Sequence, residues 1–344
     1  MSTILLHPSG QAVECGPGDT VLAALEKAGY ALPNNCRAGA CGECRTKVLD
    51  GAFDQGVVLD MALSAADRAN GFGLMCMAKP LSDVLTIEYG TKDAKPRLFP
   101  PREHMPFVVI DKLARTPAIT ELALRPLREP MRYWPGQYVQ LCDREHTIAP
   151  RNFSLASAPR AEGEILLQIS RIVGGVTSGW VHDTLRPGDR VDVSGPYGTF
   201  IGDPSVDTPV LCMAAGSGLA PILALTEAAL RRGYRRPVTL LFSARTSADI
   251  YNAGLMAYWE TRNRNFRFRP TLTQESGATL HGRIPAILPA LYPDLSEYSV
   301  FIAGNPGFVE DCGAAARALH ARDDRIHTER YIPQDQTTAQ TTSG

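Results

Sequence analysis

The sequence shows little imbalance of charge and no long block of either sign. Thirty-five Lys and Arg side chains stand against thirty-six Asp and Glu, for a formal net charge of -1. No run of five like charges occurs, so the chain lacks the electrostatic footprint of a protein that binds nucleic acid or anionic lipid. We expect neither DNA nor RNA as a partner.

Membrane and export signals are also lacking. The first ten residues have no basic region and only a short apolar stretch, which is not the pattern of a secretory signal, so we expect a cytoplasmic protein. The uncharged stretch 208–226 approaches the length of a membrane span, but Gly216, Gly218 and Pro221 interrupt it. That punctuation favours a buried strand, a turn and the start of a helix. We expect no membrane span.

The length of the chain and the pattern of its apolar residues predict several domains. At 344 residues and 44% hydrophobic content, the chain can form two to three cores. Short alternating apolar runs without long helices favour an antiparallel barrel, and strands alternating with helix-length segments favour a doubly wound parallel sheet. The expected parts are an N-terminal domain (1–92), a proline-rich linker (93–105), the barrel (106–206), the parallel sheet (207–334) and a disordered tail (335–344).

Four of the eight cysteines form a pattern. Cys36, Cys41 and Cys44 stand as C-x4-C-x2-C, and Cys76 follows thirty-two positions later, which is the plant-type spacing for a [2Fe-2S] cluster. A structural zinc site would favour two close C-x2-C pairs, so it is the weaker alternative. The other four cysteines are scattered and are interpreted as ordinary buried residues: Cys15, Cys142, Cys212 and Cys312.

A second pattern suits a flavin nucleotide. On a predicted strand, alternation places Arg151 and Phe153 on one face, where they offer charge for phosphate and a flat ring for the isoalloxazine, and Ser154 offers a hydroxyl near its N5. The stretch 174–178 precedes a short helix whose N–H groups could bind phosphate. A plain glycine turn with a Thr or Ser cap is the alternative.

A third pattern suits a pyridine nucleotide. The turn 216–218 follows a strand and opens a helix, which lets a pyrophosphate approach backbone N–H groups. At the end of the third strand, the Glu275 carboxylate would repel the 2'-phosphate of NADPH and so favours NADH. Arg245, after the second strand, argues the other way.

These motifs resemble known families. Residues 1–92 resemble a plant-type ferredoxin domain. The stretch 151–154 resembles the Arg-x-Tyr-Ser signature of the ferredoxin-NADP reductase superfamily, with Phe153 in the tyrosine position. The superfamily's phosphate motif, its Gly-x-Gly-x-x-Pro motif, its Cys-Gly-x-x-x turn and its Glu-x-Tyr ending match four further stretches, 174–178, 216–221, 303–307 (with Ala303 replacing the cysteine) and 329–331.

The resemblance implies a fold and a set of site residues. It implies a multidomain α+β and α/β protein with a β-grasp ferredoxin, a six-stranded antiparallel β-barrel for FAD and a doubly wound parallel-sheet NAD domain. The implied catalytic residues are Ser154, Glu329 and Tyr331, although an edge-strand tyrosine without a special role is a close alternative. The implied cofactor contacts are Arg151, Asn152, Phe153, Ser154, Ile169, Gly174, Gly175, Val176, Thr177, Ser178, Gly216, Ser217, Gly218, Pro221, Gly304 and Tyr331.

Across nearly its whole length the chain is similar to the three-domain NADH reductases of bacterial oxygenases and of haem-thiolate O-demethylases. The resemblance implies a monomeric reductase of aromatic catabolism that takes electrons from NADH through FAD and a [2Fe-2S] cluster to a terminal oxygenase. That oxygenase could be a ring-hydroxylating dioxygenase, a diiron monooxygenase or a haem-thiolate enzyme. Two alternatives stay open: a reductase for another acceptor, such as a deoxysugar dehydratase, and a redox carrier or sensor without turnover.

Overall fold

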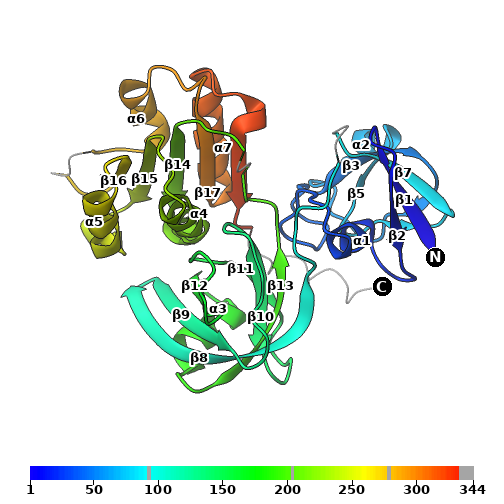
Figure 1. The fold of residues 1–344 in the computed structure, drawn as a ribbon, viewed down its shortest axis with the longest axis horizontal. Helices are drawn as coiled ribbons and strands as arrows, with labels where there is room; N and C mark the ends of the chain where they lie inside the picture. Colours follow the sequence, from blue (N-terminus) through cyan, green and yellow to red (C-terminus); the bar gives the residue numbers. More distant parts are fainter. Residues whose placement is uncertain (91–93, 203–204, 277–279, 333–344) are drawn as a thin grey trace. The chain divides into compact units, whose positions relative to one another are not determined.

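The computed structural model describes residues 1–90, 94–202, 205–276 and 280–332, which pack into two compact units (Figure 1). One unit contains Met1–Glu103 together with Ser194–Thr199, and the other contains His104–Val193 and Phe200–Tyr331. The predicted tail 335–344 and the first residue of the predicted linker lie outside the described residues.

The N-terminal domain is a small mixed sheet covered by a helix. Its central strands β1 and β7 run parallel, and the sheet order is β2-β1-β7-β3-β5. Helix α1 begins where Thr20 Oγ1 accepts a hydrogen bond from Ala23 N, and it buries Val21, Leu22 and Leu25 against the sheet. The elements are β1 (Ser2–His7), β2 (Gln11–Cys15), α1 (Val21–Lys27), β3 (Arg45–Asp50), β4 (Phe53–Asp54), α2 (Ala65–Ala69), β5 (Phe72–Leu74), β6 (Lys79–Pro80) and β7 (Val84–Glu88). This is the expected ferredoxin architecture.

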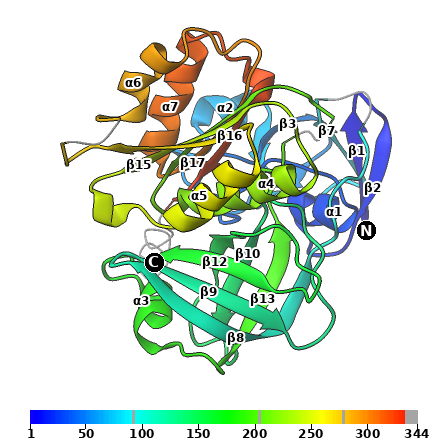
Figure 2. The same ribbon diagram turned by 60° about the vertical axis from the view of Figure 1, so that its left-hand side comes forward.

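The next domain is a nearly closed antiparallel barrel with the strand order β11-β10-β13-β8-β9-β12 (Figure 2). A bridge between Leu155 and Leu167 brings the two end strands of this order together. The strands are β8 (Arg102–Thr116), β9 (Ile119–Pro126), β10 (Tyr138–Asp143), β11 (Arg151–Ser154), β12 (Ile165–Ser170) and β13 (Arg190–Tyr197). The six-stranded barrel is therefore confirmed.

The first barrel strand begins earlier than the sequence predicts. Strand β8 starts at Arg102, inside the predicted linker 93–105. The prolines of that linker end at Pro101, and Met105, Phe107 and Val109 then alternate into the barrel core. Proline content marks the linker, but the apolar alternation sets where the strand begins.

The C-terminal domain is a parallel sheet with the order β16-β15-β14-β17-β18. Its elements are β14 (Val210–Ala215), α4 (Leu219–Arg231), β15 (Val238–Ala244), α5 (Ala253–Arg262), β16 (Phe266–Leu272), α6 (Ile284–Leu291), β17 (Ser299–Gly304), α7 (Pro306–Ala318) and β18 (Ile326–Arg330). Along β14, Cys212 and Ala214 pack with α4 and α5, whereas Leu211 and Met213 pack with α6 and α7 (Figures 1 and 2). Helices therefore cover both faces, and the doubly wound sheet is confirmed.

This topology predicts where a ligand binds. The strand order reverses at β14, which has β15 on one side and β17 on the other. In open parallel sheets, ligands bind beyond the carboxyl ends of the strands at such a switch point. The turn 216–218 follows β14 at that end of the sheet.

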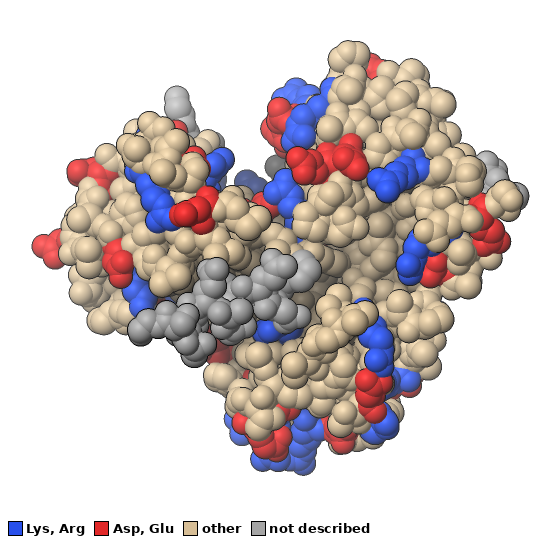
Figure 3. Space-filling view, turned by 180° about the vertical axis from the view of Figure 1, so that it is seen from behind, with Lys and Arg blue, Asp and Glu red and all other residues tan. Residues whose placement is uncertain are grey.

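Among the described residues, no helix is long and apolar enough to cross a membrane. The uncharged stretch 208–226 instead contains β14 and the buried first turns of α4. On the face drawn in Figure 3, acidic and basic side chains are interspersed rather than gathered by sign.

A glycine before β10 should be required for barrel stability. Gly136 has a φ of +92°, and an added Cβ would lie 2.1 Å from the Phe200 carbonyl oxygen. We predict that Gly136→Ala lowers the free energy of unfolding by about 1–3 kcal/mol or prevents folding. Thermal unfolding of the purified protein measures this. Gly254→Ala is the control, since nothing lies within 4 Å of its added Cβ. Equal melting temperatures for the two variants would contradict the prediction.

Candidate functional site

The four patterned cysteines converge in the N-terminal unit. Cys36, Cys41 and Cys44 lie in the loop between α1 and β3, and Cys76 follows β5. Their thiols form two pairs, Cys36 with Cys41 and Cys44 with Cys76. Within the first pair, the hydrogen bond from Cys41 lowers the pKa of Cys36 to about 5, and the pKa of Cys41 itself is raised. The fold therefore brings the sulfur of Cys76, which is distant in sequence, to the three cysteines of the loop.

Backbone N–H groups point at these sulfurs. Ala38 N and Ala40 N each donate to Cys36 Sγ over 3.4 Å, and Cys76 N donates to Cys44 Sγ over 3.4 Å. Such bonds stabilise thiolates and tune a cluster's potential. The donor set fits a [2Fe-2S] cluster, which requires an anionic sulfur at each of four positions.

Glycine shapes the cysteine loop where it is closest to its neighbours. Gly39 has a φ of +69°, and an added Cβ would lie 3.0 Å from both the Val57 carbonyl oxygen and Val58 Cγ1. Only glycine fits this close approach without strain. The loop therefore lies directly against the segment that precedes α2.

A buried ion pair, which no sequence motif indicates, ties the same loop to α1. Arg37 Nη1 lies 2.6 and 2.8 Å from the two carboxylate oxygens of Glu26, which is only 3% exposed. Burial raises the pKa of Glu26, and Arg37 opposes that rise. Loss of either partner would leave a poorly solvated charge beside the cysteine loop.

In the second unit, one hydrogen-bonded chain joins the three predicted catalytic residues. Tyr331 OH donates to Ser154 Oγ over 2.9 Å, and Ser154 Oγ donates to Glu329 Oε1 over 2.8 Å. Tyr331 OH also lies 3.3 Å from the Ser217 carbonyl oxygen. The flavin strand, the nucleotide turn and the end of β18 therefore meet at one point.

Glu329 is an unusual carboxyl group. It is 7% exposed, and its Oε2 has no hydrogen-bond partner among the described residues. Burial raises the pKa of Glu329 to about 8, although the bond from Ser154 opposes the rise. Burial, and then the nearby Glu329, also raise the pKa of Tyr331. At neutral pH Glu329 is therefore largely protonated and uncharged.

The nucleotide turn is packed against the end of β17. Gly216 has a φ of +56°, and an added Cβ on Gly218 would lie 2.2 Å from the Ala303 carbonyl oxygen. Tyr331 N donates to the Gly304 carbonyl oxygen over 2.8 Å, which ties the C-terminal segment to the same place. Pro221 is buried in the first turn of α4, where its missing N–H costs nothing. Gly216, Gly218, Gly304 and Tyr331 are thus neighbours, as the motifs predicted.

A buried polar network that the sequence analysis missed supports this turn. Tyr251 OH lies 2.9 Å from the Gly216 carbonyl oxygen and 3.2 Å from Gln168 Oε1, so these two acceptors share its one proton. Gln168 Nε2 donates in turn to Glu121, which pairs with Arg115 at 2.7 Å. The network crosses from the nucleotide turn into the barrel. Its members are single polar residues on separate elements, so no local sequence motif predicts them.

The predicted phosphate turn forms, but without the cap that was considered. Helix α3 (Val176–Gly179) starts after Gly175, which makes no side-chain cap. Thr177 Oγ1 donates to the Ala149 carbonyl oxygen over 2.9 Å, and Ser178 Oγ accepts from Ile172 N. Thr177 therefore fixes the turn to the loop before β11, and Ser178 closes the turn on itself, while the N–H groups of the first turn have no partner within the helix.

The other predicted flavin contacts are placed unevenly. Arg151, Asn152 and Phe153 lie on β11 beside Ser154, and the Phe153 ring packs partly against the barrel core. Gly174, with a φ of +75°, opens the turn before α3. The side chain of Ile169 is wholly buried in the barrel core, and its carbonyl oxygen lies 3.0 Å from His182 Nε2. A cofactor contact at Ile169 stays a prediction.

The structure also bears on nicotinamide nucleotide preference. Glu275 accepts hydrogen bonds from Ser247 N and Ser247 Oγ over 2.6 and 3.0 Å, which holds its carboxylate beside the loop after β15. Arg245, the residue that argued for NADPH, lies 3.8 Å from Asp249. The Asp249 carboxylate therefore offsets the positive charge of Arg245, which would otherwise attract the 2'-phosphate of NADPH. This arrangement favours NADH.

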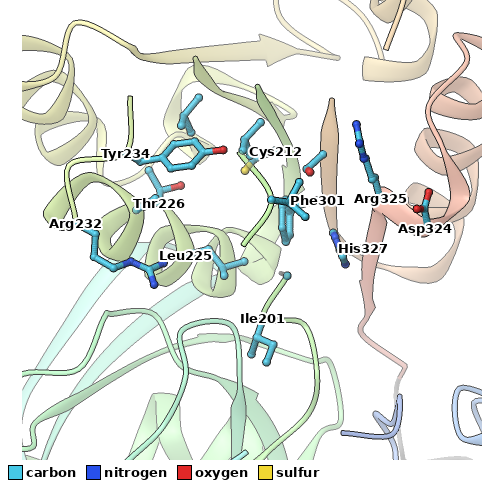
Figure 4. A pocket seen from close by; sticks show the side chains of 16 residues that line it. Ile201, Cys212, Leu225, Thr226, Arg232, Tyr234, Phe301, Asp324, Arg325 and His327 are labelled. Carbon is cyan, nitrogen blue, oxygen red and sulfur yellow. The ribbon is translucent and has the colours of Figure 1, made fainter. Parts of the chain in front are cut away.

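A cavity of about 480 Å³ lies elsewhere in the C-terminal domain (Figure 4). Its lining includes Val210, Val238 and Ser299, the first residues of β14, β15 and β17. The cavity is therefore at the amino ends of the strands, opposite the edge that carries the nucleotide turn. It is not the nucleotide site.

Three family models match successive parts of the chain. A 2Fe-2S iron-sulfur cluster binding domain matches residues 4–81, an oxidoreductase FAD-binding domain matches residues 105–201, and an oxidoreductase NAD-binding domain matches residues 212–313. The order agrees with the domain order predicted from the motifs.

Full-length relatives have the same organisation. The reductase subunit of an aromatic O-demethylase from Amycolatopsis sp. is 34% identical over 96% of this chain and 99% of its own length. The reductase component of phenol 2-monooxygenase from Pseudomonas sp. is 35% identical over 79% of this chain and 76% of its own. The crystal structure of an Amycolatopsis cytochrome P450 reductase superposes with a TM-score of 0.86 at 32% identity, covering 97% of this chain and 99% of that one.

The raised pKa of Glu329 predicts a pH dependence for flavin reduction by NADH. Glu329 is neutral below its pKa of about 8 and ionises above it. Reduction adds negative charge nearby, so we predict that the rate falls as pH rises through about 8. Anaerobic stopped-flow absorbance measures the rate. In Glu329→Gln, which is neutral at every pH, this decline should vanish. A decline of the same size in the variant would assign it to another group.

The Glu275 carboxylate should discriminate between the two nicotinamide nucleotides. We predict that Glu275→Gln lowers the ratio of kcat/KM for NADH over NADPH about tenfold, because it removes a charge worth about 1.4 kcal/mol against the 2'-phosphate. Steady-state kinetics with both nucleotides measures the ratio. Glu310→Gln, an exposed carboxylate change on α7, is the control and should leave the ratio unchanged. An unaltered ratio in Glu275→Gln would exclude this role.

Proposed function

Since the chain belongs to the family of oxidoreductases that join a [2Fe-2S] ferredoxin domain to FAD-binding and NAD-binding domains, we propose that it serves a terminal oxygenase of the haem-thiolate O-demethylase type. The chain is an NADH-dependent iron-sulfur flavoprotein reductase. The proposal concerns which acceptor it serves and which residues do the work.

The contacts of the Tyr331 hydroxyl are the main support for placing the reaction centre at Ser154. The Tyr331 hydroxyl contacts both Ser154 Oγ and the Ser217 carbonyl oxygen, so the flavin strand and the nucleotide turn are joined through a single side chain. A pair of ligands held by these two elements would meet there. Direct transfer between them requires such contact.

The residues of this centre have distinct roles in the proposal. Arg151 and the N–H groups at the start of α3 would bind the flavin diphosphate, and the turn 216–218 would bind the pyrophosphate of NADH. Ser154 would orient the flavin ring through its hydroxyl. Glu329 would hold a proton at Oε2 and so keep the centre uncharged at neutral pH. Tyr331 would cover the ring until nicotinamide enters.

The electron path ends at the cysteine loop. Cys36, Cys41, Cys44 and Cys76 would hold the cluster, while Gly39 and the surrounding N–H groups keep the loop close around it. FAD, when bound, takes electrons from NADH in a pair and releases them singly to such a cluster. The segment beside the loop exposes two large apolar side chains, Val57 and Met61, which would suit contact with an acceptor protein.

The haem-thiolate acceptor is favoured over the other oxygenase classes. Among relatives that match over nearly all of both chains, the O-demethylase reductase subunit is 34% identical, whereas a phenol hydroxylase P5 protein and a terephthalate 1,2-dioxygenase reductase component are 29% identical. The cytochrome P450 reductase structure is 32% identical over a similar share of both chains. A diiron phenol hydroxylase is the second candidate, because the phenol 2-monooxygenase reductase is 35% identical over a shorter stretch. A dehydratase partner and a carrier without turnover are the weaker proposals. NADH is an intracellular metabolite, so we also propose that the protein works in the cytoplasm.

Reconstitution with two acceptors tests the proposal. With NADH under anaerobic conditions, the protein should reduce a bacterial haem-thiolate O-demethylase oxygenase, followed as its ferrous carbon monoxide complex, faster than a diiron phenol hydroxylase. Faster reduction of the diiron enzyme would favour the second candidate. If NADH is not oxidised with either oxygenase or with ferricyanide, the protein is a redox carrier without turnover.

A cluster variant tests the path itself. In Cys41→Ala, we predict that NADH-driven ferricyanide reduction persists while reduction of the haem protein falls at least about tenfold, because flavin can pass electrons to a small oxidant without the cluster. Cys15→Ala, at a buried cysteine outside the loop, should retain both activities. Haem reduction that survives loss of the cluster would contradict the path.

A further inference from the structure

A second group of potential metal ligands lies in the barrel, away from the cysteine loop. His104 is on β8, His146 is on the loop between β10 and β11, and Asp192 is on β13. Each offers one ligand atom, and all of these atoms lie within 4.8 Å of one another. Three separate elements of the barrel therefore converge on one point, and none of the three residues belongs to the predicted flavin set.

The distances are close to those of a coordination site. His104 Nδ1 lies 3.3 Å from Asp192 Oδ1, and His146 Nε2 lies 3.9 Å from Asp192 Oδ2. The two imidazole rings meet edge to face with centroids 4.9 Å apart. Bonds of about 2.0–2.1 Å to a tetrahedral zinc ion place ligand atoms about 3.4 Å apart. Small rotations of the two exposed histidine side chains would bring the longer distance, 3.9 Å, to this value.

The surroundings orient one ligand and leave room for another. His146 Nδ1 lies 3.4 Å from Cys142 Sγ, so its other nitrogen faces Asp192. A partner on the second nitrogen of a ligating histidine commonly fixes the ring in this way. Asp192 is 13% exposed and held in the barrel wall, whereas His104 and His146 are 66% and 45% exposed. A fourth position would therefore face solvent.

We propose that His104, His146 and Asp192 form a binding site for one divalent transition-metal ion. Zinc is the ion used to test it. Two imidazoles and one carboxylate suit zinc, nickel and copper, whereas calcium and magnesium prefer oxygen ligands throughout. The site differs from the cysteine loop in its ligand chemistry and in the unit that carries it.

Binding has a structural consequence for the flavin strand. The loop 144–150 carries His146 and leads directly into Arg151, and Ala149 in the same loop accepts the hydrogen bond from Thr177. An ion held by all three ligands ties this loop to β8 and β13. Because the ion binds the folded state alone, it raises the melting temperature of the protein.

Calorimetric titration of zinc into the iron- and flavin-loaded protein tests the proposal. We expect one ion per chain, with iron and flavin contents unchanged, and a higher melting temperature. His146→Ala should weaken binding at least about tenfold and abolish the thermal shift. Asp192→Asn, which keeps the shape of the side chain, is the second variant and should also weaken binding.

A matched histidine provides the control. His320 is exposed and lies 3.6 Å from Asp294 but has no second histidine near it among the described residues. His320→Ala should bind zinc as the parent does. The proposal is overturned if the parent shows no zinc binding, or if His146→Ala and Asp192→Asn bind zinc as tightly as the parent. The trio would then be only two histidine rings in edge-to-face contact beside a carboxylate.

Discussion

The hydrogen-bonded chain from Tyr331 through Ser154 to Glu329 is the constraint on which the functional half of the molecule depends. It requires β18 to end beside β11, although Ser154 and Glu329 lie 175 positions apart in sequence. The parallel register places Glu329 opposite Ala303 on β17, and Gly218 approaches the carbonyl of that same residue. The doubly wound order and the absent Cβ of Gly218 are therefore both needed to bring the turn 216–218 beside Glu329 and Ser154.

This arrangement is maintained at some cost in stability. A carboxyl group whose folded pKa is raised contributes stability below its unfolded pKa and loses it as pH rises through the folded value, so Glu329 destabilises the fold increasingly up to about pH 8. Its unpartnered Oε2 adds a further desolvation cost. Such groups collect at functional sites because the chemistry requires them. The network from Tyr251 to Glu121 supplies compensating rigidity behind the turn.

Motifs with a fixed spacing were predictable, and contacts between distant single residues were not. The cysteine spacing and the glycine turns identify their chemistry because the backbone itself must take a particular shape there. By contrast, Tyr251, Gln168 and the Glu26–Arg37 pair depend on tertiary packing, which no local pattern in the sequence predicts.

The central claim is that one chain takes electrons in pairs at the Ser154 centre and stores one of them at the cysteine loop. Two separate anaerobic titrations, one with a strong reductant and one with NADH, test it most directly. Both are monitored by visible absorbance and electron paramagnetic resonance. The account predicts uptake of about three electrons per chain, two on flavin and one on a [2Fe-2S] cluster. Uptake of about two, with the iron-sulfur absorbance unchanged, would contradict it.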